Sequence, residues 1–431
     1  MAIVAPLRAP IRALPPELLR VIFEMTLPES DRSLKSSTPP LLLCQVCKIW
    51  RDVAITSPTL WNSVSVDASS VRTIANCVHL LEMAVERAGD TPIGLDLHEY
   101  MNYSKQGAPP LLLTTLAPSF SRYQNLSLSV QSPHWYHDLA LMSPALSSLP
   151  KLKNLTLLVN HHNIEFNRGL NISPLHLFKA APLLTSVCLD LKHPGGNLFI
   201  HLPYSQLLDL DYRLTLRVPN STSYAIRCWQ AAIACATNLI SAKLTFLSQR
   251  NVFRQQPTLK PAENPKPRTS DVQELAITYG VLGDVGSIFY GLELPKLSTL
   301  SFRAVRACLV IVDRDAKPSM LYYFDVKPLR PTLFHKLESL TLLFVLIYDN
   351  QLLSLLEAIP NIRHFCLLSV AECSICRLPQ SFGPKKSALT RFLTVPVVEE
   401  EAVERADYLL PKLETLELFY PATTIPCTSS S

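Results

Sequence analysis

A short apolar motif recurs along most of this 431-residue chain and constrains its fold more than any other feature. The motif has the pattern apolar-x-x-apolar-x-apolar, often with a proline two residues before its first position. The clear copies are Leu152/Leu155/Leu157, Leu184/Val187/Leu189, Leu239/Ala242/Leu244, Val272/Leu275/Ile277, Leu297/Leu300/Phe302, Leu337/Leu340/Leu342, Ile362/Phe365/Leu367 and Leu413/Leu416/Leu418. Weaker copies are Tyr123/Leu126/Leu128 and the run 207–210. Such recurrence indicates a chain built from stacked units.

Each copy of this repeat motif predicts one short strand. Its last two apolar positions are two residues apart, so both side chains point to the same face of a strand. Apolar runs suited to helices, such as 223–236 and 349–358, lie between copies. One such unit cannot bury its own apolar face, so neighbours must stack. The pattern is typical of leucine-rich repeats, and we predict an α/β fold over residues 68–420. It would be an irregular solenoid, a horseshoe with parallel strands and outer helices.

The spacing of the motif is irregular. Val272 and Leu297 are 25 residues apart, whereas Ile362 and Leu413 are 51 apart. We attribute the scatter to insertions near 248–270 and 371–406. An ordinary two-layer α/β domain is the alternative interpretation, and the prolines that recur before the motif favour the solenoid over it.

Composition excludes several classes of protein. Hydrophobic residues make up 48% of the chain and charged residues 17%, so a globally disordered chain is excluded. The longest apolar run, 342–348, is far shorter than the ~20 residues of a membrane-spanning helix, so none is predicted. Most of the net charge of +5 comes from the Pro-rich segment 248–270, which leaves the remainder nearly neutral. We therefore do not expect a nucleic-acid partner.

The residue types that carry chemistry are scattered. The C-x-x-C pairs Cys44/Cys47 and Cys373/Cys376 have no second ligand pair at zinc spacing, and the cluster 134–138 (HWYHD) lacks a further donor. No nucleophile has an evident base, and only 11 glycines occur, none in a phosphate-binding pattern. We expect no cofactor, no metal and no catalytic residue, so the chain is not predicted to be an enzyme.

The 11 cysteines are best read as reduced thiols. Their number is odd, and the first 16 residues lack the apolar core of a signal peptide. Reduced thiols place the chain in the cytoplasm, the nucleus or both.

The first sixty residues predict a compact helical segment. In the stretch LPPELLRVIF, apolar residues recur at the spacing of one helix face, at Leu18, Leu19, Ile22 and Phe23. A second helix is predicted over 41–55, with an apolar stripe formed by Leu43, Val46, Cys47, Trp50 and Ala54. Ser57 and Pro58 then have the residue types of an N-cap and a first helical position, which predicts a third, short helix. The alternating run 62–67 (NSVSVD) predicts a strand.

These elements, in this order, resemble the F-box of fungal F-box proteins. The resemblance lies in the leading Leu-Pro, the ELL-xx-IF helix, the VC-xx-W-R-D-x-A helix and the trailing P-x-LW. It implies binding to the Skp adaptor of a cullin-RING ubiquitin ligase and, through the adaptor, to a cullin. Carried over position by position, the adaptor-binding residues would be Leu14, Pro15, Leu18, Leu19, Ile22, Phe23, Leu42, Val46 and Trp50.

The resemblance and the repeats together predict four segments. These are a flexible N-terminus at 1–10, an F-box at 11–67, the leucine-rich-repeat-like solenoid at 68–420 and a flexible tail at 421–431. The implied function is substrate recognition in an SCF-type ubiquitin ligase, in which the solenoid binds a target protein. Candidate target-binding residues are Lys153, Lys243 and Arg303. The alternative is an interaction scaffold unrelated to ubiquitin, whose helical segment serves only as a solenoid cap or for dimerisation.

Overall fold

The computed structural model describes residues 14–28, 38–67, 71–98, 116–130, 149–160, 176, 178–192, 200–216, 221–248, 268–279, 288–289, 291–305, 334–345, 347, 349–368 and 410–419. Most of the two predicted insertions, the cluster at 134–138 and the second C-x-x-C pair lie outside these residues.

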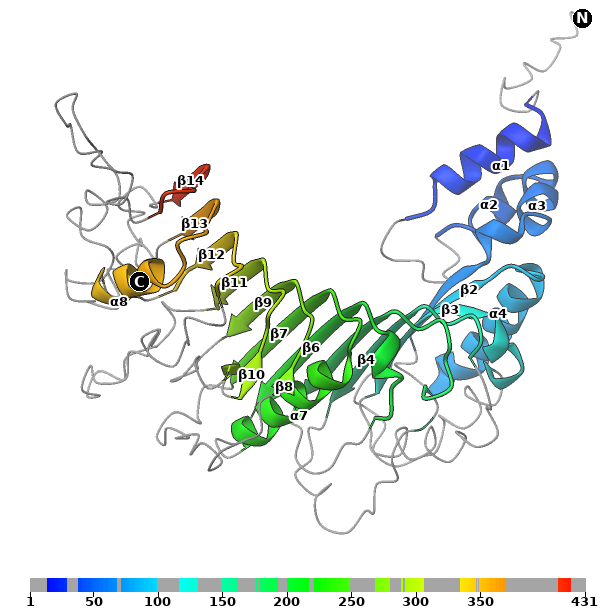
Figure 1. Ribbon diagram of the computed structural model, residues 1–431. Coiled ribbons are helices and arrows are strands. Elements are labelled where there is room, and N and C mark those ends of the chain that lie inside the picture. Colours follow the sequence, from blue (N-terminus) through cyan, green and yellow to red (C-terminus); the bar gives the residue numbers. More distant parts are fainter. Residues whose placement is uncertain are drawn as a thin grey trace, which may run out of the picture. The chain divides into compact units, whose positions relative to one another are not determined.

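Helices dominate the first part of the chain and strands dominate the rest (Figure 1). The α-helices are α1 (Pro16–Met25), α2 (Leu43–Val46), α3 (Lys48–Ile55), α4 (Val71–Arg87), α7 (Ser221–Cys235) and α8 (Asp349–Glu357). Short 3₁₀ helices are η2 (Pro58–Leu60), η3 (Ala117–Arg122) and η5 (Tyr204–Gln206). We call α1, α2, α3 and η2 together the helical module.

The strands form one large sheet and one small one. The large sheet contains β1 (Ser63–Asp67), β2 (Ile93–His98), β3 (Tyr123–Val130), β4 (Asn154–Asn160), β5 (Ser186–Lys192), β6 (Asp209–Leu216), β7 (Ser241–Ser248), β9 (Glu274–Tyr279), β11 (Thr299–Ala304), β12 (Ser339–Leu343), β13 (His364–Leu368) and β14 (Thr415–Phe419), in that order. The small sheet pairs β8 (Arg268–Thr269) with β10 (Leu292–Glu293).

The predicted α/β class is confirmed. The large sheet has 12 strands in sequence order, and its described pairings within β1 to β4 and within β6 to β14 are all parallel. The chain divides into two compact units, a first of 1–187 with 195–203 and a second of 188–194 with 204–431. The first unit holds the helical module as well as β1 to β4, and the proposed domain boundary at 67/68 stays a prediction.

The predicted motif residues form the core of each unit. Every apolar position of the copies on β3, β4, β5, β7, β9, β11, β12 and β13 is at least 97% buried. On β14, by contrast, Leu413, Leu416 and Leu418 are only partly buried. Since β14 ends the sheet order, its copy has a neighbouring strand on one side only.

A tight turn precedes each motif and explains its proline. In eight copies the amide of the first apolar residue donates to the carbonyl three residues earlier, at 3.0–3.3 Å. The acceptor and donor residues are Leu149/Leu152, Ala181/Leu184, Tyr204/Leu207, Ala236/Leu239, Leu294/Leu297, Phe334/Leu337, Ile359/Ile362 and Leu410/Leu413. Proline two residues before the motif occupies the second position of this turn, where its fixed φ fits and no amide is needed.

A repeated backbone contact sets the register of the second unit. The carbonyl of Ile240 accepts from the amides of Gln273 and Glu274, at 2.9 and 3.0 Å. The same forked contact recurs at the carbonyls of Leu208, Gln273, Ser298, Glu338 and Arg363. Each copy is therefore held against the next at the same position.

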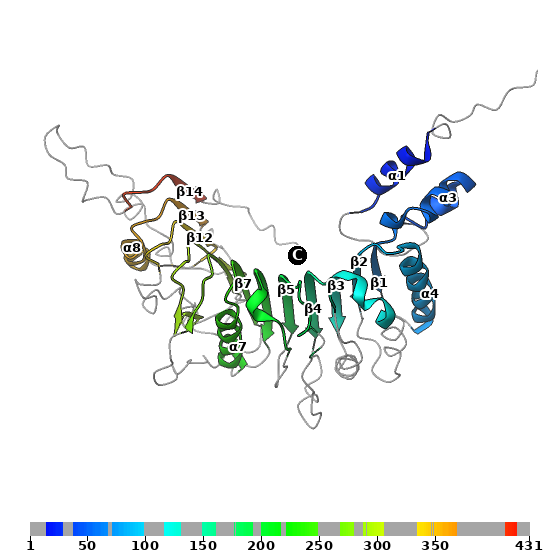
Figure 2. The same cartoon turned by 45° about the vertical axis from the view of Figure 1, so that its right-hand side comes forward.

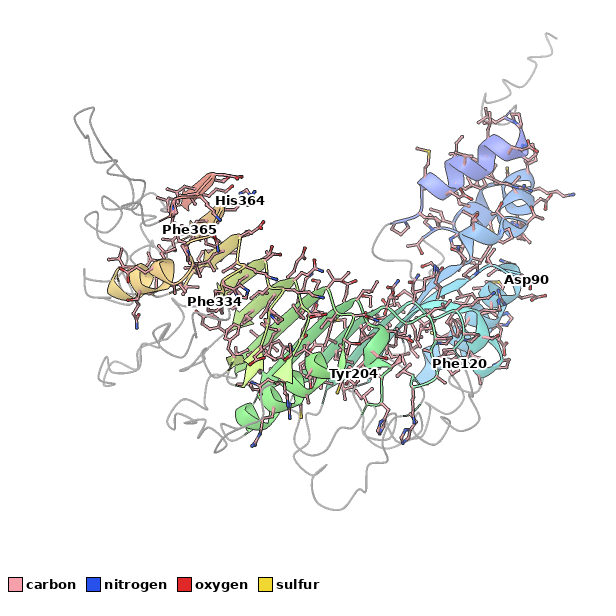
Figure 3. All side chains as sticks on the ribbon, viewed as in Figure 1. Asp90, Phe120, Tyr204, Phe334, His364 and Phe365 are labelled. Atoms are coloured by element: carbon pink, nitrogen blue, oxygen red, sulfur yellow. The ribbon has the colours of Figure 1, made fainter. Side chains whose placement is uncertain are left out.

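In the second unit the helices cover one face of the sheet. Figures 1 and 2 both show α7 and α8 on the same side of these strands. Their apolar residues, Ile226, Trp229, Ile233, Leu352, Leu355 and Leu356, are buried. No described helix covers the opposite face, which we call the open face. The alternation between faces can be followed at β13 in Figure 3, where Phe365 is buried and His364 is exposed.

The helical module departs from prediction in two ways. The expected single apolar face of α1 is split, because Leu19 and Phe23 are buried while Leu18 and Ile22 are exposed. Adjacent residues on a helix point about 100° apart, so one flat neighbour cannot cover both pairs.

The predicted helix over 41–55 is also broken. Cys47 adopts an extended conformation (φ −160°, ψ 172°) and separates α2 from α3. The break removes the amide of Lys48 as a donor to the carbonyl of Cys44, and Arg51 Nε donates to that carbonyl instead, at 2.8 Å. The short helix after Ser57 is present as η2, but the Ser57 hydroxyl makes no cap and donates to the Val53 carbonyl at 2.6 Å.

Candidate protein-interaction surfaces

Exposed apolar side chains gather on the helical module. Of the 11 large apolar side chains that are exposed among the described residues, seven belong to α1, α3 and the short α2 with its N-cap. They are Leu18, Val21, Ile22, Met25, Leu42, Val46 and Ile49. We call these seven the apolar patch. Such a concentration of exposed apolar side chains marks a protein interaction site or an aggregation liability.

The exposed residues of α1 share one face of that helix. Leu18, Val21, Ile22 and Met25 are spaced by three, four and seven residues, which places them along one side. Leu18 is 51% exposed and Met25 is 82% exposed. The other side of α1 carries buried Leu19 and Phe23, so α1 is apolar on both sides.

The inward side of the module is filled by its own residues. The rings of Phe23 and Trp50 lie 4.9 Å apart at an interplanar angle of 56°. Trp61 is fully buried; its Nε1 donates to the carbonyl of Ala54 at 2.8 Å, and the guanidinium of Arg87 lies 4.4 Å from its ring centroid. The module therefore has a core without the apolar patch.

The nine predicted adaptor-binding residues fall into three groups. Pro15, Leu18, Ile22, Leu42 and Val46 are exposed, Leu14 and Trp50 are partly buried, and Leu19 and Phe23 are buried. The buried pair packs inward and offers no contact surface.

Sequence reasoning missed three members of the patch. Val21 and Met25 follow Leu18 at helical spacing, which is a signal in the sequence that could have found them. Ile49 had no such signal, because its position depends on the break at Cys47.

The first C-x-x-C pair lies at the junction of α2 and α3. Cys44 and Cys47 are both partly buried, and burial raises the pKa of Cys44 although Arg87 and Arg51 act to lower it. Within the described residues, no group of three or more His, Cys, Asp or Glu side chains could hold a metal ion.

Paired charges lie on the open face at β5 and β6. Arg213 donates to Asp211 Oδ2 through Nη2 at 2.6 Å and through Nε at 3.0 Å.

Burial, with Asp211 and Asp190 adding to it, raises the pKa of the Cys188 thiol to about 11, against the opposing effect of Arg213. Burial also raises the pKa of Asp190. Cys188 is therefore a protonated thiol at neutral pH and a poor nucleophile.

A further carboxylate, that of Asp96, lies on the strands of the first unit. Asp96 Oδ2 and His98 Nε2, both on β2, are 2.8 Å apart. Burial acts to raise the pKa of Asp96, but hydrogen bonds from His98 and Ser127 outweigh it and lower that pKa. The Asp96 carboxylate is thus stabilised in its charged form by His98 on the same strand and by Ser127 on β3.

The three candidate target-binding residues are all exposed, but they do not form one site within a unit. Lys243 on β7 lies opposite Asp211 and Ala276, and Arg303 on β11 lies opposite Thr278 and Leu343. Lys153 precedes β4 in the first unit. Lys243 and Arg303 therefore share the open face of the second unit, whereas Lys153 belongs to the first unit.

Compared with protein-family models and with curated proteins, the sequence matches none. The helices of the described residues include none with the length and hydrophobicity needed to cross a membrane.

Proposed function

We propose that residues 11–67 form an F-box that binds the Skp adaptor of an SCF-type cullin-RING ubiquitin ligase, and that residues 68–420 form a leucine-rich-repeat-like horseshoe that binds a target protein. The chain is then a substrate-recognition subunit rather than an enzyme. It acts in the cytoplasm or nucleus, supplying proximity and orientation for chemistry carried out by other subunits. The observation that carries this proposal is the apolar patch on the module whose sequence resembles an F-box.

The spacing of the patch suits recognition by a helix-binding groove. Such recognition uses anchors at i, i+3, i+4 and i+7, the spacing of Leu18, Val21, Ile22 and Met25. Fully burying one such side chain contributes about 1.5–3 kcal/mol. Since Leu19, Phe23 and Trp50 already fill the module's interior, the patch is available to a partner.

The test is a quantitative binding assay between the full chain and the purified adaptor. We expect Leu18→Glu/Ile22→Glu to weaken adaptor binding at least tenfold, because two charges would be buried against an apolar groove. Leu183→Glu is the matched control, since Leu183 is 48% exposed and lies in the turn before β5, outside the module. Equal adaptor binding by both variants would overturn the interface, provided that circular dichroism shows both folded.

Dimerisation through the same patch is the competing function. A repeat array needs its ends covered, and β1, which follows the module, is an end strand paired only with β2. Light scattering on the chain alone separates the two functions. A dimer that Leu18→Glu/Ile22→Glu converts to a monomer, together with no adaptor binding, would replace the ligase proposal with the scaffold.

A further inference from the structure

The open face of the second unit carries two unpaired cations above small side chains. Lys243 and Arg303 are exposed, and neither side chain forms an ion pair or hydrogen bond with a described residue. Between them in the register lie Ala276, Thr278 and Ser301. All three side chains are short, and each is partly exposed.

Acidic residues also lie on this face, near Lys243. Asp211, opposite Lys243, is engaged by Arg213. Glu274 lies on β9 two residues before Ala276 and is exposed. No carboxylate stands directly opposite Arg303, whose neighbours in register are Thr278 and Leu343.

The same face becomes apolar on the next two strands. Leu343 on β12 lies opposite Leu368 on β13, and both are partly exposed. Phe344, immediately after β12, is 36% exposed and has a φ of 58°. Its amide donates to the carbonyl of Leu368 at 2.7 Å, which holds it in this conformation.

The conformation of Phe344 is itself informative. A bulky residue with positive φ is uncommon and strained. Strained residues persist where the surroundings hold them and gather at binding sites.

We propose that this face binds an extended acidic segment of a partner protein, with its carboxylates at Lys243 and Arg303 and an apolar side chain on Leu343, Phe344 and Leu368. Strands in a sheet are about 4.8 Å apart, so β7 to β13 span about 19 Å, the length of roughly six extended residues. Arg303 and Leu368 are two strands apart, which sets a spacing of about three residues between carboxylate and apolar side chain. That this partner is the ligase's target rests on the proposed function; the binding itself does not.

The proposal is tested by selecting peptides that bind the full chain from a display library of random twelve-residue peptides. We expect enriched peptides to carry acidic residues and an aromatic or aliphatic residue about three positions away. A synthetic peptide of the enriched sequence should bind Lys243→Glu and Arg303→Glu at least tenfold more weakly. Lys336→Glu, which changes an exposed lysine in the turn before β12, is the control and should bind unchanged.

Phe344→Asn adds a readout that a purely structural residue would not give. Asparagine tolerates positive φ, so this variant should raise the thermal midpoint while weakening peptide binding. The proposal would be overturned if panning enriches no consensus, or if the consensus lacks either acidic residues or an apolar residue. Unchanged peptide binding by Arg303→Glu would also overturn it.

Adaptor binding of the same variants separates this proposal from the ligase proposal. Arg303→Glu should lose the peptide and keep the adaptor, whereas Leu18→Glu/Ile22→Glu should do the reverse. If the wild-type chain binds the peptide but does not bind the adaptor, only the ligase proposal is overturned.

Discussion

Leu18 and Leu19 are adjacent in α1 and have opposite environments: Leu18 is 51% exposed, and Leu19 is 1% exposed. Leu19 is buried on the same side of α1 as Phe23, whereas Leu18 belongs to the apolar patch. Substitutions at these two leucines can therefore test the folding of the module separately from its proposed binding.

Replacing each of these leucines with alanine should have very different effects on stability. Leu19→Ala removes buried methyl groups and leaves a cavity, so it should cost about 2–5 kcal/mol of unfolding free energy. Leu18→Ala should stay within about 0.5 kcal/mol of the wild type. Urea unfolding followed by tryptophan fluorescence measures both. A loss above 2 kcal/mol for Leu18→Ala would mean that the patch is part of the interior.

Two buried tryptophans offer a matched test of hydrogen bonding. Trp61 and Trp229 are both fully buried, but only Trp61 has a partner for its indole N–H; Trp229 Nε1 has none among the described residues. Phenylalanine at either site loses similar volume. Trp61→Phe removes the short indole bond to the Ala54 carbonyl, which then keeps only the longer bond of 3.4 Å from the Ser57 amide, whereas Trp229→Phe removes an unsatisfied donor. We expect Trp61→Phe to be more destabilising by about 1–3 kcal/mol.

Thermal unfolding of the two phenylalanine variants and the wild type measures the loss of stability in each variant and so checks this difference. Equal losses of stability would show that the indole N–H of Trp229 finds a partner in solution.

The turn before each motif predicts a stabilising proline. Thr237 occupies the position that proline holds in the turns at Pro295 and Pro360; it is exposed, and its amide donates no backbone hydrogen bond to a described residue. Thr237→Pro should add about 0.4–1 kcal/mol, because proline restricts the unfolded chain, and Pro295→Ala should cost a similar amount. Chemical denaturation of both variants tests the pair. Destabilisation by Thr237→Pro would mean that this turn differs from the others.

The partly buried thiol of Cys188 on β5 should react slowly. With a pKa of about 11 against an ordinary 9.0, Cys188 has about one hundredth of the usual thiolate fraction at pH 8. Its alkylation rate should rise with pH until about 11, and Asp211→Asn should raise the rate at pH 8, because that carboxylate raises the thiol's pKa. Mass spectrometry of iodoacetamide-treated protein measures the rate, and exposed Cys235 serves as the internal reference. A slower rate in Asp211→Asn would mean that Asp211 lowers, rather than raises, the pKa of Cys188.

The repeat motif predicted the strands well because its physics is local. Residues two apart on a strand share a face, so Leu155 and Leu157 could be assigned to the core without knowing what covers them. The apolar residue that opens each turn, such as Leu149 or Ile359, was not predicted. Its backbone carbonyl accepts the turn hydrogen bond from the first motif residue, a turn that the apolar pattern does not show.

The candidate surfaces were less predictable. Both faces of α1 are apolar, and sequence alone could not tell which one packs inward. The break at Cys47 was also hidden, since Arg51 supplies the replacement donor from seven residues away.

The chain's own sequence determined the α/β class, the strand positions and the helices at the start, because apolar periodicity and turn chemistry act over a few residues. Only the tertiary structure decided that Leu19 is interior and Leu18 is not, and that Lys243, Arg303 and Phe344 share one unit. The physical reason is that exposure is set by neighbours distant in sequence, whose packing no local pattern encodes.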